Sequence, residues 1–180
     1  QKDNPKHIKT LKENSIPQID LVIVNLYPFE STISNPKCNL ELAIENIDIG
    51  GPTMIRAAAK NFKSVAVLTN PNEYDNFSKQ LIENKGGLEE SYRFKLAQNA
   101  FSHTAHYDKI ISDYLSKNDK QINFPKTLIQ SMNKKMDMRY GENPHQEAAF
   151  YAEPQIQNGA LANLKQVQGK ELSFNNLNDS

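Results

Sequence analysis

The chain has 180 residues, and its 21 lysines and arginines balance its 21 aspartates and glutamates, which gives a formal net charge of zero at pH 7. Proteins that bind nucleic acid or anionic membranes through charge carry a basic excess, so this composition argues against both classes of partner. The mean hydropathy of −0.67 is low. Because the apolar residues nevertheless gather in periodic runs, the chain is expected to be a soluble globular protein rather than a disordered one.

The cysteine content and the apolar runs predict a cytoplasmic location. Cys38 is the single cysteine, so it has no partner for an internal disulfide, and no signal-peptide pattern opens the sequence. The most apolar run, Ile19 to Leu26, is far shorter than the roughly 20 residues of a membrane span. Because the chain starts at Gln1 without a methionine and stops at Ser180 in a polar run, both ends are expected to be cuts in a longer protein.

Alternating helices and strands are predicted for the first part of the chain. Asn4 followed by Pro5 is a typical helix start, which predicts a short surface helix over residues 3–14. Residues 19–26 are rich in β-branched side chains with almost no polar alternation. This pattern predicts a strand of a parallel sheet that is buried on both faces.

The next segments continue the alternation. Apolar residues recur at helical spacing over 39–47, residues 48–53 break the pattern, and Pro52 opens a second helix that runs to Lys60. Residues 64–69 resemble another short buried strand. The order of elements therefore favours a layered α/β fold with a parallel sheet.

A long helix and a polar linker are predicted to end the first domain. An apolar stripe runs from Leu88 to Leu115, and residues 116–135 have the polar composition of a linker or of a helix at a domain boundary. We therefore expect one domain over residues 1–130 and the start of a second over 131–180. The second part is close to the roughly 40 residues below which a chain cannot bury a core alone, so it is expected to be incomplete.

The turn at residues 48–53, Asp-Ile-Gly-Gly-Pro-Thr, is a candidate binding loop. A helix N-terminus offers free N–H groups to an anion or a carbonyl oxygen, and Gly50 and Gly51 allow a close approach of the backbone. A pair of glycines is weak evidence by itself, because it also occurs in simple turns. Asp48, Thr53 and Lys60 strengthen the binding interpretation.

The spacing of Asp48 and Lys60 leaves two interpretations open. Lys60 lies eight residues after Pro52, or about 12 Å along a straight helix, so a direct ion pair with Asp48 is not expected. Helical side chains lean toward the N-terminus, which leaves a gap of ligand size between the two groups. A solvated lysine at a helix C-terminus is the alternative, and spacing alone favours it.

Three further features carry weaker chemical signals. His103 and His106 have a spacing that can present two imidazoles to one metal, but no third ligand is aligned with them, so packed histidines are favoured and no metal site is expected. Cys38 is expected to be an inert thiol. Residues 139–146, Arg-Tyr-Gly-Glu-Asn-Pro-His-Gln, form a rigid polar loop that serves equally well as a ligand contact or a turn at the domain entry.

Four motifs together resemble one family. They are VNLYPFE at 24–30, IDIGGPTMIRAAAKN at 47–61, AFSHTAHYD at 100–108 and MRYGENPHQ at 138–146. In this order they resemble the bifunctional purine biosynthesis proteins, which join an IMP cyclohydrolase to an aminoimidazole-carboxamide ribonucleotide (AICAR) formyltransferase. The resemblance implies the later part of a methylglyoxal-synthase-like α/β domain, followed by the start of a cytidine-deaminase-like transformylase domain.

The resemblance also implies site residues, substrates and partners. Its nucleotide contacts fall on Val24, Asn25, Asp48 and Ile49, its acid/base lysine on Lys60 and an active-site tyrosine on Tyr27. Arg139 and Tyr140 match the pair that holds the nucleotide in the transformylase site, and His145 lies close to that pair. The implied ligands are AICAR, formyl-AICAR and IMP, with 10-formyltetrahydrofolate as the formyl donor, and the implied assembly is a homodimer with transformylase sites between subunits.

The chemistry of ring closure suits these residue types. A poorly nucleophilic carboxamide nitrogen must attack a formamide carbonyl, and water must then leave, so acid/base groups are required. We expect Asp48 to orient the carboxamide N–H, Lys60 to stabilise the developing oxyanion and Tyr27 to relay a proton. The amides of Gly50 and Gly51 are further candidate donors.

The sequence leaves two other functions open. The family's early phosphate-binding loops and its second active-site lysine are expected before Gln1, and its transformylase lysine and histidine motif is expected after Ser180. Neither site is therefore expected to be complete, and the isolated chain is expected to be inactive. One alternative is a non-catalytic module that binds purine mononucleotides through residues 48–53. A second is a metal hydrolase built on His103 and His106.

Overall fold

The computed structural model describes residues 4–119, 124, 126–154, 160–163 and 165–179. It divides into two compact units, residues 1–125 and residues 126–180, and each is considered by itself. The predicted domain boundary at residue 130 remains a prediction.

The first helix begins where the sequence predicts. Helix α1 spans Pro5–Glu13, and Asn4 precedes it with an extended backbone. The Asn4 side-chain oxygen accepts the N–H of Lys6 at 3.0 Å, which satisfies one of the free donors at the helix start. The predicted surface helix is therefore confirmed.

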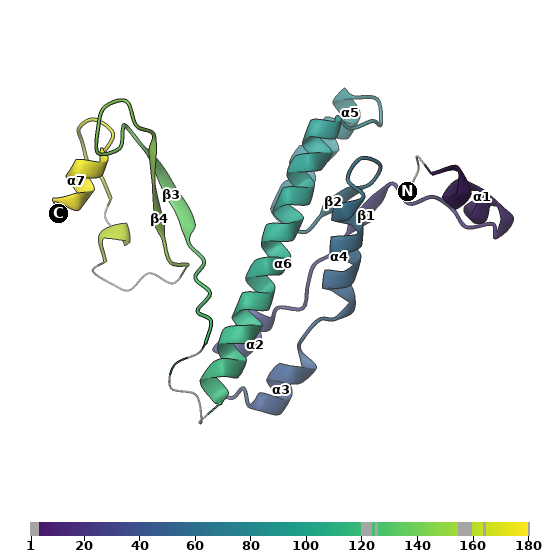
Figure 1. Ribbon diagram of the computed structural model, residues 1–180, viewed down its shortest axis with the longest axis horizontal. Helices are drawn as coiled ribbons and strands as arrows, with labels where there is room; N and C mark the ends of the chain where they lie inside the picture. Colours follow the sequence, from purple (N-terminus) through teal and green to yellow (C-terminus); the bar gives the residue numbers. More distant parts are fainter. Residues whose placement is uncertain (1–3, 120–123, 125, 155–159, 164, 180) are drawn as a thin grey trace. The chain divides into compact units, whose positions relative to one another are not determined.

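A two-stranded parallel sheet forms the centre of the first unit (Figure 1). Strand β1, Leu21–Ile23, pairs in parallel with β2, Ala66–Leu68, with Val22 opposite Val67. Every residue of β2 is buried, as expected. The predicted burial of β1 on both faces is wrong: Val22 packs on the core, whereas Leu21 and Ile23 are exposed. Alternate side chains of a strand point to opposite faces, and within the described residues only one face of β1 is covered.

Helices connect and cover this sheet. After β1 come α2, Phe29–Ser34, and α3, Leu40–Glu45, and then α4, Gly50–Lys60. After β2 come a 3₁₀ turn η1, Pro71–Glu73, then α5, Tyr74–Glu83, and the long α6, Glu90–Asn118. The predicted helices over 39–47 and 88–115 are confirmed. Helix α4 starts two residues before the predicted opening at Pro52, because the Asp48 carboxylate accepts the N–H of Gly51 and supports an earlier start.

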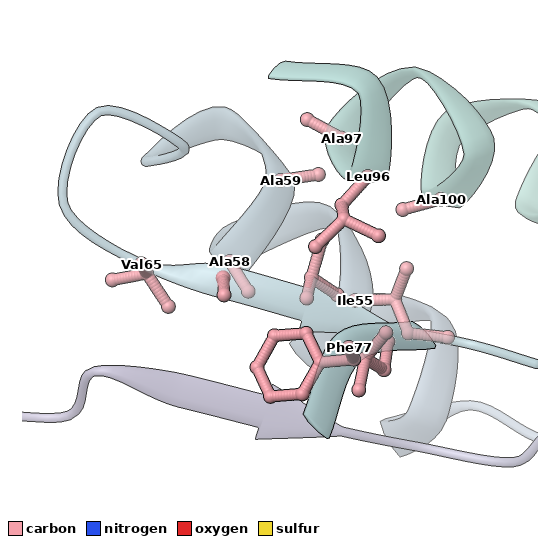
Figure 2. Close-up of a cluster of buried hydrophobic side chains, with 11 residues drawn as sticks. Ile55, Ala58, Ala59, Val65, Phe77, Leu96, Ala97 and Ala100 are labelled. Carbon is pink, nitrogen blue, oxygen red and sulfur yellow. The ribbon is translucent and has the colours of Figure 1, made fainter. Parts of the chain in front are cut away.

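The main core lies where α4 and α6 pack together beside β2. Figure 2 shows Ala59 of α4 close to Leu96 and Ala97 of α6, and the same buried cluster contains Ile55, Ala58, Phe77 and Ala100. Small residues on both helices allow their backbones to approach closely, and Leu96 fills the space that remains. This packing fixes α4, and with it the loop that precedes α4.

A second cluster lies farther along α6 and supports the segment between α2 and α4. Phe29 of α2, Ala43 of α3 and Tyr107 of α6 are its buried members, and Ile47 packs against them. The Phe29 and Tyr107 rings meet edge to face, with centroids 6.2 Å apart. The segment just before α4 is therefore held both by α2 and α3, which precede it in sequence, and by α6, which follows it.

The second unit is a small antiparallel hairpin with a short helix. Strand β3, Asn133–Met138, pairs with β4, Ala148–Ala152. A 3₁₀ turn η2, Leu161–Asn163, and helix α7, Phe174–Asn178, follow. The chain beside α7 hydrogen-bonds to the loop after β3, since Arg139 N–H donates to Leu172 O at 2.8 Å and Phe174 N–H donates to Tyr140 O at 3.1 Å.

Candidate functional site

Asp48 is the centre of the candidate site in the first unit. It is half-buried, and its carboxylate accepts two main-chain donors: Gly51 N–H at 2.7 Å on Oδ1 and Tyr27 N–H at 3.3 Å on Oδ2. The segment after β1 is thus tied to the start of α4. Of the three predicted catalytic residues, the structure joins Asp48 and Tyr27, through the main-chain N–H of Tyr27.

Gly51 is required by the space around Asp48. A Cβ atom on this residue would lie 2.6 Å from Asp48 Oδ2 and 2.6 Å from a methyl carbon of Leu26, closer than real Cβ contacts. A Cβ on Gly50 would meet nothing within 4 Å. Because the Gly51 N–H already donates to Asp48, Gly50 is left as the glycine whose amide can serve as a further donor to a ligand.

Tyr107 is a residue of the site that sequence reasoning missed. Its hydroxyl oxygen accepts Asp48 N–H at 2.9 Å and donates to the carbonyl oxygen of Asn46 at 3.4 Å. Burial raises the pKa of this phenol, more than the nearby Asp48 and Asp108 charges do. The available signal was a tyrosine within the apolar stripe of a long helix, since a buried phenol needs a polar partner.

Two of the predicted nucleotide contacts, Val24 and Asn25, lie at the carboxyl end of β1, and Ile49 lies directly before α4. Val24 is half-buried and continues the sheet, because its N–H donates to Leu68 O at 3.0 Å. Asn25 is exposed, and its side-chain amide donates to the Tyr74 hydroxyl at 3.3 Å. Ile49 is 74% exposed beside Asp48. Ligands of parallel α/β sheets bind at this edge, which makes the position suitable for a nucleotide.

Lys60 lies apart from the Asp48 loop. It is exposed and is the last residue of α4, so about 15 Å of helix separates it from Gly50. Arg93 of α6 holds the chain just after it, donating to the carbonyl oxygens of Phe62 and Lys63 at 2.9 Å each. The structure therefore does not place the backbone of Lys60 next to Asp48, and the lysine side chain has to lean back along α4 to shorten the gap between the two groups.

Arg139 and Tyr140 form the candidate site of the second unit. The guanidinium lies over the neighbouring ring, 4.8 Å from its centroid, and donates to the Tyr140 hydroxyl at 3.1 Å. A hydrogen bond from Ser173, together with the hydrogen bond and charge of Arg139, lowers the pKa of Tyr140. Arg139 is exposed, so most of its donors face solvent and are available to an anion.

The loop after Tyr140 is held by its own hydrogen bonds. Gly141 N–H donates to Gln146 O at 2.7 Å, and Asn143 N–H donates to the Gln146 side-chain oxygen at 2.9 Å. His145 is exposed on this loop.

Ser173 is a second residue that the sequence did not indicate: it is 1% exposed, hydrogen-bonds to Asn176 at 3.0 Å and caps α7. Its signal was a serine three residues before an amide side chain, the pattern of a capping box.

The remaining candidates show no built site. Burial, and next the charge of His106, lower the pKa of His103, which suits a packed imidazole on α6. Within the described residues, no group of three or more histidines, cysteines, aspartates or glutamates is placed to hold a metal ion. The Cys38 thiol donates to Asn39 O at 3.4 Å. Among the residues that the structure describes, every helix is too short or too polar to cross a membrane.

Two family models match the chain. An MGS-like domain matches residues 1–53, which include the Asp48 loop, and the model described as AICARFT/IMPCHase bienzyme matches residues 58–180, more than half of the chain. Together with the parallel sheet, these matches confirm the expected order of an MGS-like α/β part followed by the bienzyme part.

Curated relatives and a solved structure agree with these models. The bifunctional purine biosynthesis protein PurH from Neisseria meningitidis serogroup A is 50% identical over 188 residues, an alignment that covers 100% of this chain and 36% of that relative. The PurH from Thermoanaerobacter sp. is 52% identical over 179 residues, which covers 99% of this chain and 35% of that relative. The chain thus spans about a third of the length of these relatives. The crystal structure of ForH is similar with a TM-score of 0.51 and 33% identity, covering 61% of this chain and 57% of that one. Because the bienzyme model covers most of the chain, the chain belongs to the AICARFT/IMPCHase bienzyme family.

Proposed function

We propose that this chain is the middle part of a bifunctional enzyme of purine nucleotide biosynthesis. In this proposal the first unit contributes to ring closure of formyl-AICAR to IMP, and the second contributes to formyl transfer from 10-formyltetrahydrofolate to AICAR. Family membership and the PurH relatives support the two reactions. The observation that carries the first is the Asp48 carboxylate, held at the carboxyl end of a parallel strand by Gly51 and Tyr27.

Ring closure needs one bond formed and one water lost. The carboxamide nitrogen attacks the formyl carbon and loses a proton while the carbonyl oxygen gains one, which gives a hydroxyl group. That hydroxyl takes up a second proton and leaves as water, while a ring nitrogen loses a proton and the C=N bond forms. Asp48 is suited to accept the carboxamide N–H, because a carboxylate has about four acceptor sites and two here serve Gly51 and Tyr27. This contact orients the nitrogen toward the formyl carbon.

Lys60 and Tyr27 complete the proposed acid/base set. The carboxamide nitrogen and the formyl oxygen belong to one reaction centre, so the Lys60 side chain extends back along α4 toward the Asp48 loop, the direction in which helical side chains lean, and its ammonium stabilises the developing oxyanion there. Tyr27 is 57% exposed, and its phenol is available to relay a proton. Val24, Asn25, Ile49 and the Gly50 amide contact the nucleotide at the edge of the sheet.

The second unit supplies nucleotide contacts for formyl transfer. The stacked Arg139 presents a planar fork of donors, which suits a bidentate grip on phosphate or carboxamide oxygens. Tyr140 and His145 add polar contacts from the same loop. The groups that carry the formyl chemistry are expected from other parts of the full-length enzyme, together with the folate site.

Two broader features belong to the same proposal. A protein of this family is expected to work as a homodimer whose transformylase sites lie between subunits. A cytoplasmic location fits a biosynthetic enzyme that uses nucleotides and folate. Both rest on family membership.

The test is an Asp48→Asn substitution in the full-length enzyme that contains this segment. Asparagine keeps one oxygen for the Gly51 N–H but loses the charge, so ring closure of supplied formyl-AICAR should fall by about a hundredfold or more. Formyl transfer to AICAR should stay within about twofold, because that site is assigned to residues 139–145. An unmodified enzyme that binds these nucleotides but closes no ring would instead favour a non-catalytic binding module.

A further inference from the structure

We propose that Tyr107 is a positioning residue for ring closure, because its hydroxyl fixes the two peptide units on either side of Ile47, directly before Asp48. This inference rests on the proposed function of Asp48 and extends it to a residue on α6, the long helix of the first unit. Tyr107 is 59 residues away from Asp48 in sequence and contacts it through the main chain. It is therefore assigned no contact with substrate.

One hydroxyl makes two hydrogen bonds to the chain before α4. The Tyr107 oxygen accepts Asp48 N–H at 2.9 Å and donates to Asn46 O at 3.4 Å. Ile47, between these residues, packs against the same aromatic cluster. The peptide units on both sides of Ile47 are thus held by one atom, which fixes the direction in which the chain enters the Asp48 turn.

The ring that carries this hydroxyl is itself held firmly. Tyr107 is 7% exposed, and its ring meets Phe29 edge to face at 6.2 Å and 68°. A buried tyrosine has few rotamers available, so packing of the ring determines the position of the oxygen. Because burial raises the pKa of the phenol, its proton stays on the oxygen at neutral pH and the donor to Asn46 is kept.

Asp48 is consequently bound from three segments. Its N–H donates to α6, and its two carboxylate oxygens accept from Gly51 at the start of α4 and from Tyr27 after β1. An acid/base or orienting group must be held in its productive geometry, and a displacement of about 1 Å can lower a rate a hundredfold. The Tyr107 hydroxyl supplies the main-chain part of this positioning.

Tyr114 is a matched control on the same helix. It lies two helical turns after Tyr107, and its ring meets the same Phe29 edge to face at 5.9 Å and 90°. Its hydroxyl interacts with Cys38 and Asn118. Tyr114→Phe therefore removes a hydroxyl from the same aromatic cluster while leaving the hydrogen bonds of residues 46–48 in place.

The experiment compares Tyr107→Phe with Tyr114→Phe in the full-length enzyme. Phenylalanine keeps the ring, so Tyr107→Phe should lower kcat for ring closure of formyl-AICAR by roughly ten- to hundredfold and leave formyl transfer within about twofold. Tyr114→Phe should leave both rates within about twofold. Amide hydrogen exchange read by NMR should be about tenfold faster at Asp48 N–H in Tyr107→Phe only, as expected for the loss of one hydrogen bond.

Three outcomes separate this inference from the proposed function. If Asp48→Asn loses ring closure but Tyr107→Phe keeps it, the positioning role is wrong and the proposed function stands. If Asp48→Asn keeps ring closure, the proposed function fails, and exchange at Asp48 N–H still tests the hydrogen bond. Should Tyr107→Phe not fold, exchange at Asp48 N–H in the unmodified enzyme decides, because a rate equal to that of an unstructured peptide overturns the inference.

Discussion

The carboxylate of Asp48 accepts the N–H of Gly51 at 2.7 Å and at the same time fills the space that a Cβ on Gly51 would need. The two residues therefore depend on each other. The hydrogen bond starts α4 at Gly50 and fixes the carboxylate, and the missing side chain at Gly51 lets the carboxylate lie this close to the helix.

The glycine pair gives a prediction with an internal control. Gly51→Ala places a methyl group 2.6 Å from Asp48 Oδ2 and from Leu26, so it should lower the free energy of unfolding of the first unit by about 1 to 3 kcal/mol. Gly50→Ala meets nothing within 4 Å in the first turn of α4 and should be neutral or stabilising by up to about 1 kcal/mol. Urea denaturation followed by circular dichroism measures both. Equal effects of the two alanines would show that the space around Asp48 is not tight.

Signals that lie within a few residues were readable from the sequence. Asn4 before Pro5 marks the start of α1, and Asn39 caps α3 by accepting the N–H of Leu42 at 2.8 Å. The apolar runs of β1 and β2 also predicted strands of a parallel sheet. In each case the residues that cause the structure are neighbours in the chain, so local propensity and spacing are enough.

Contacts between distant segments were not readable in the same way. The hydrogen bond from Asp48 N–H to Tyr107 spans 59 residues, and nothing near Asp48 indicates its partner. The exposure of Ile23 depends on what covers each face of β1, which the strand's own composition does not reveal. Gly51 resembles any turn glycine until Asp48 and Leu26 are placed beside it. Tertiary packing decides these features.

The isolated chain should catalyse neither reaction at a useful rate. It spans about a third of the length of its PurH relatives, and catalytic groups that act together fail together when some are missing. Purified chain incubated with formyl-AICAR should form IMP no faster than the uncatalysed reaction. Turnover close to that of a full-length relative would mean that residues 1–180 contain a complete ring-closing site.

Arg139→Lys in the full-length enzyme should weaken the use of AICAR. Lysine offers a point charge in place of a planar fork, so about 1.5 to 3 kcal/mol of transition-state stabilisation should be lost. The value of kcat/KM for AICAR should therefore fall roughly ten- to hundredfold. Ring closure of supplied formyl-AICAR should be unchanged. Arg56→Lys is the control, because Arg56 also lies over an aromatic ring, Phe101 at 5.4 Å, but in the first unit. A loss of thermal stability and of both activities in Arg139→Lys would make Arg139 a packing residue.

His103 should titrate below its ordinary pKa of 6.5, because burial, and then the charge of His106, disfavour its protonated form. In the pH range between the lowered pKa of folded His103 and about 6.5, the unfolded chain binds more protons than the folded chain. The free energy of unfolding should therefore decrease as the pH falls through this range. NMR titration of the imidazole measures that pKa directly. His106→Gln should raise it part of the way toward 6.5, and His103→Gln should reduce the acid loss of stability. A His103 pKa above 6.5 would contradict the burial argument.

The role of Lys60 in ring closure is tested by the rate of that reaction in the full-length enzyme with Lys60→Met. Lysine and methionine have similar helix propensity, so α4 should remain folded. Lys63→Met, which changes an exposed lysine just beyond the same helix, is the control. Lys60→Met should lower kcat for ring closure of formyl-AICAR by about a hundredfold or more, and its formyl transfer should stay within about twofold of the unmodified enzyme. Lys63→Met should leave both rates within about twofold. Ring closure at the unmodified rate in Lys60→Met, or an equal loss of both activities, would contradict this role of Lys60.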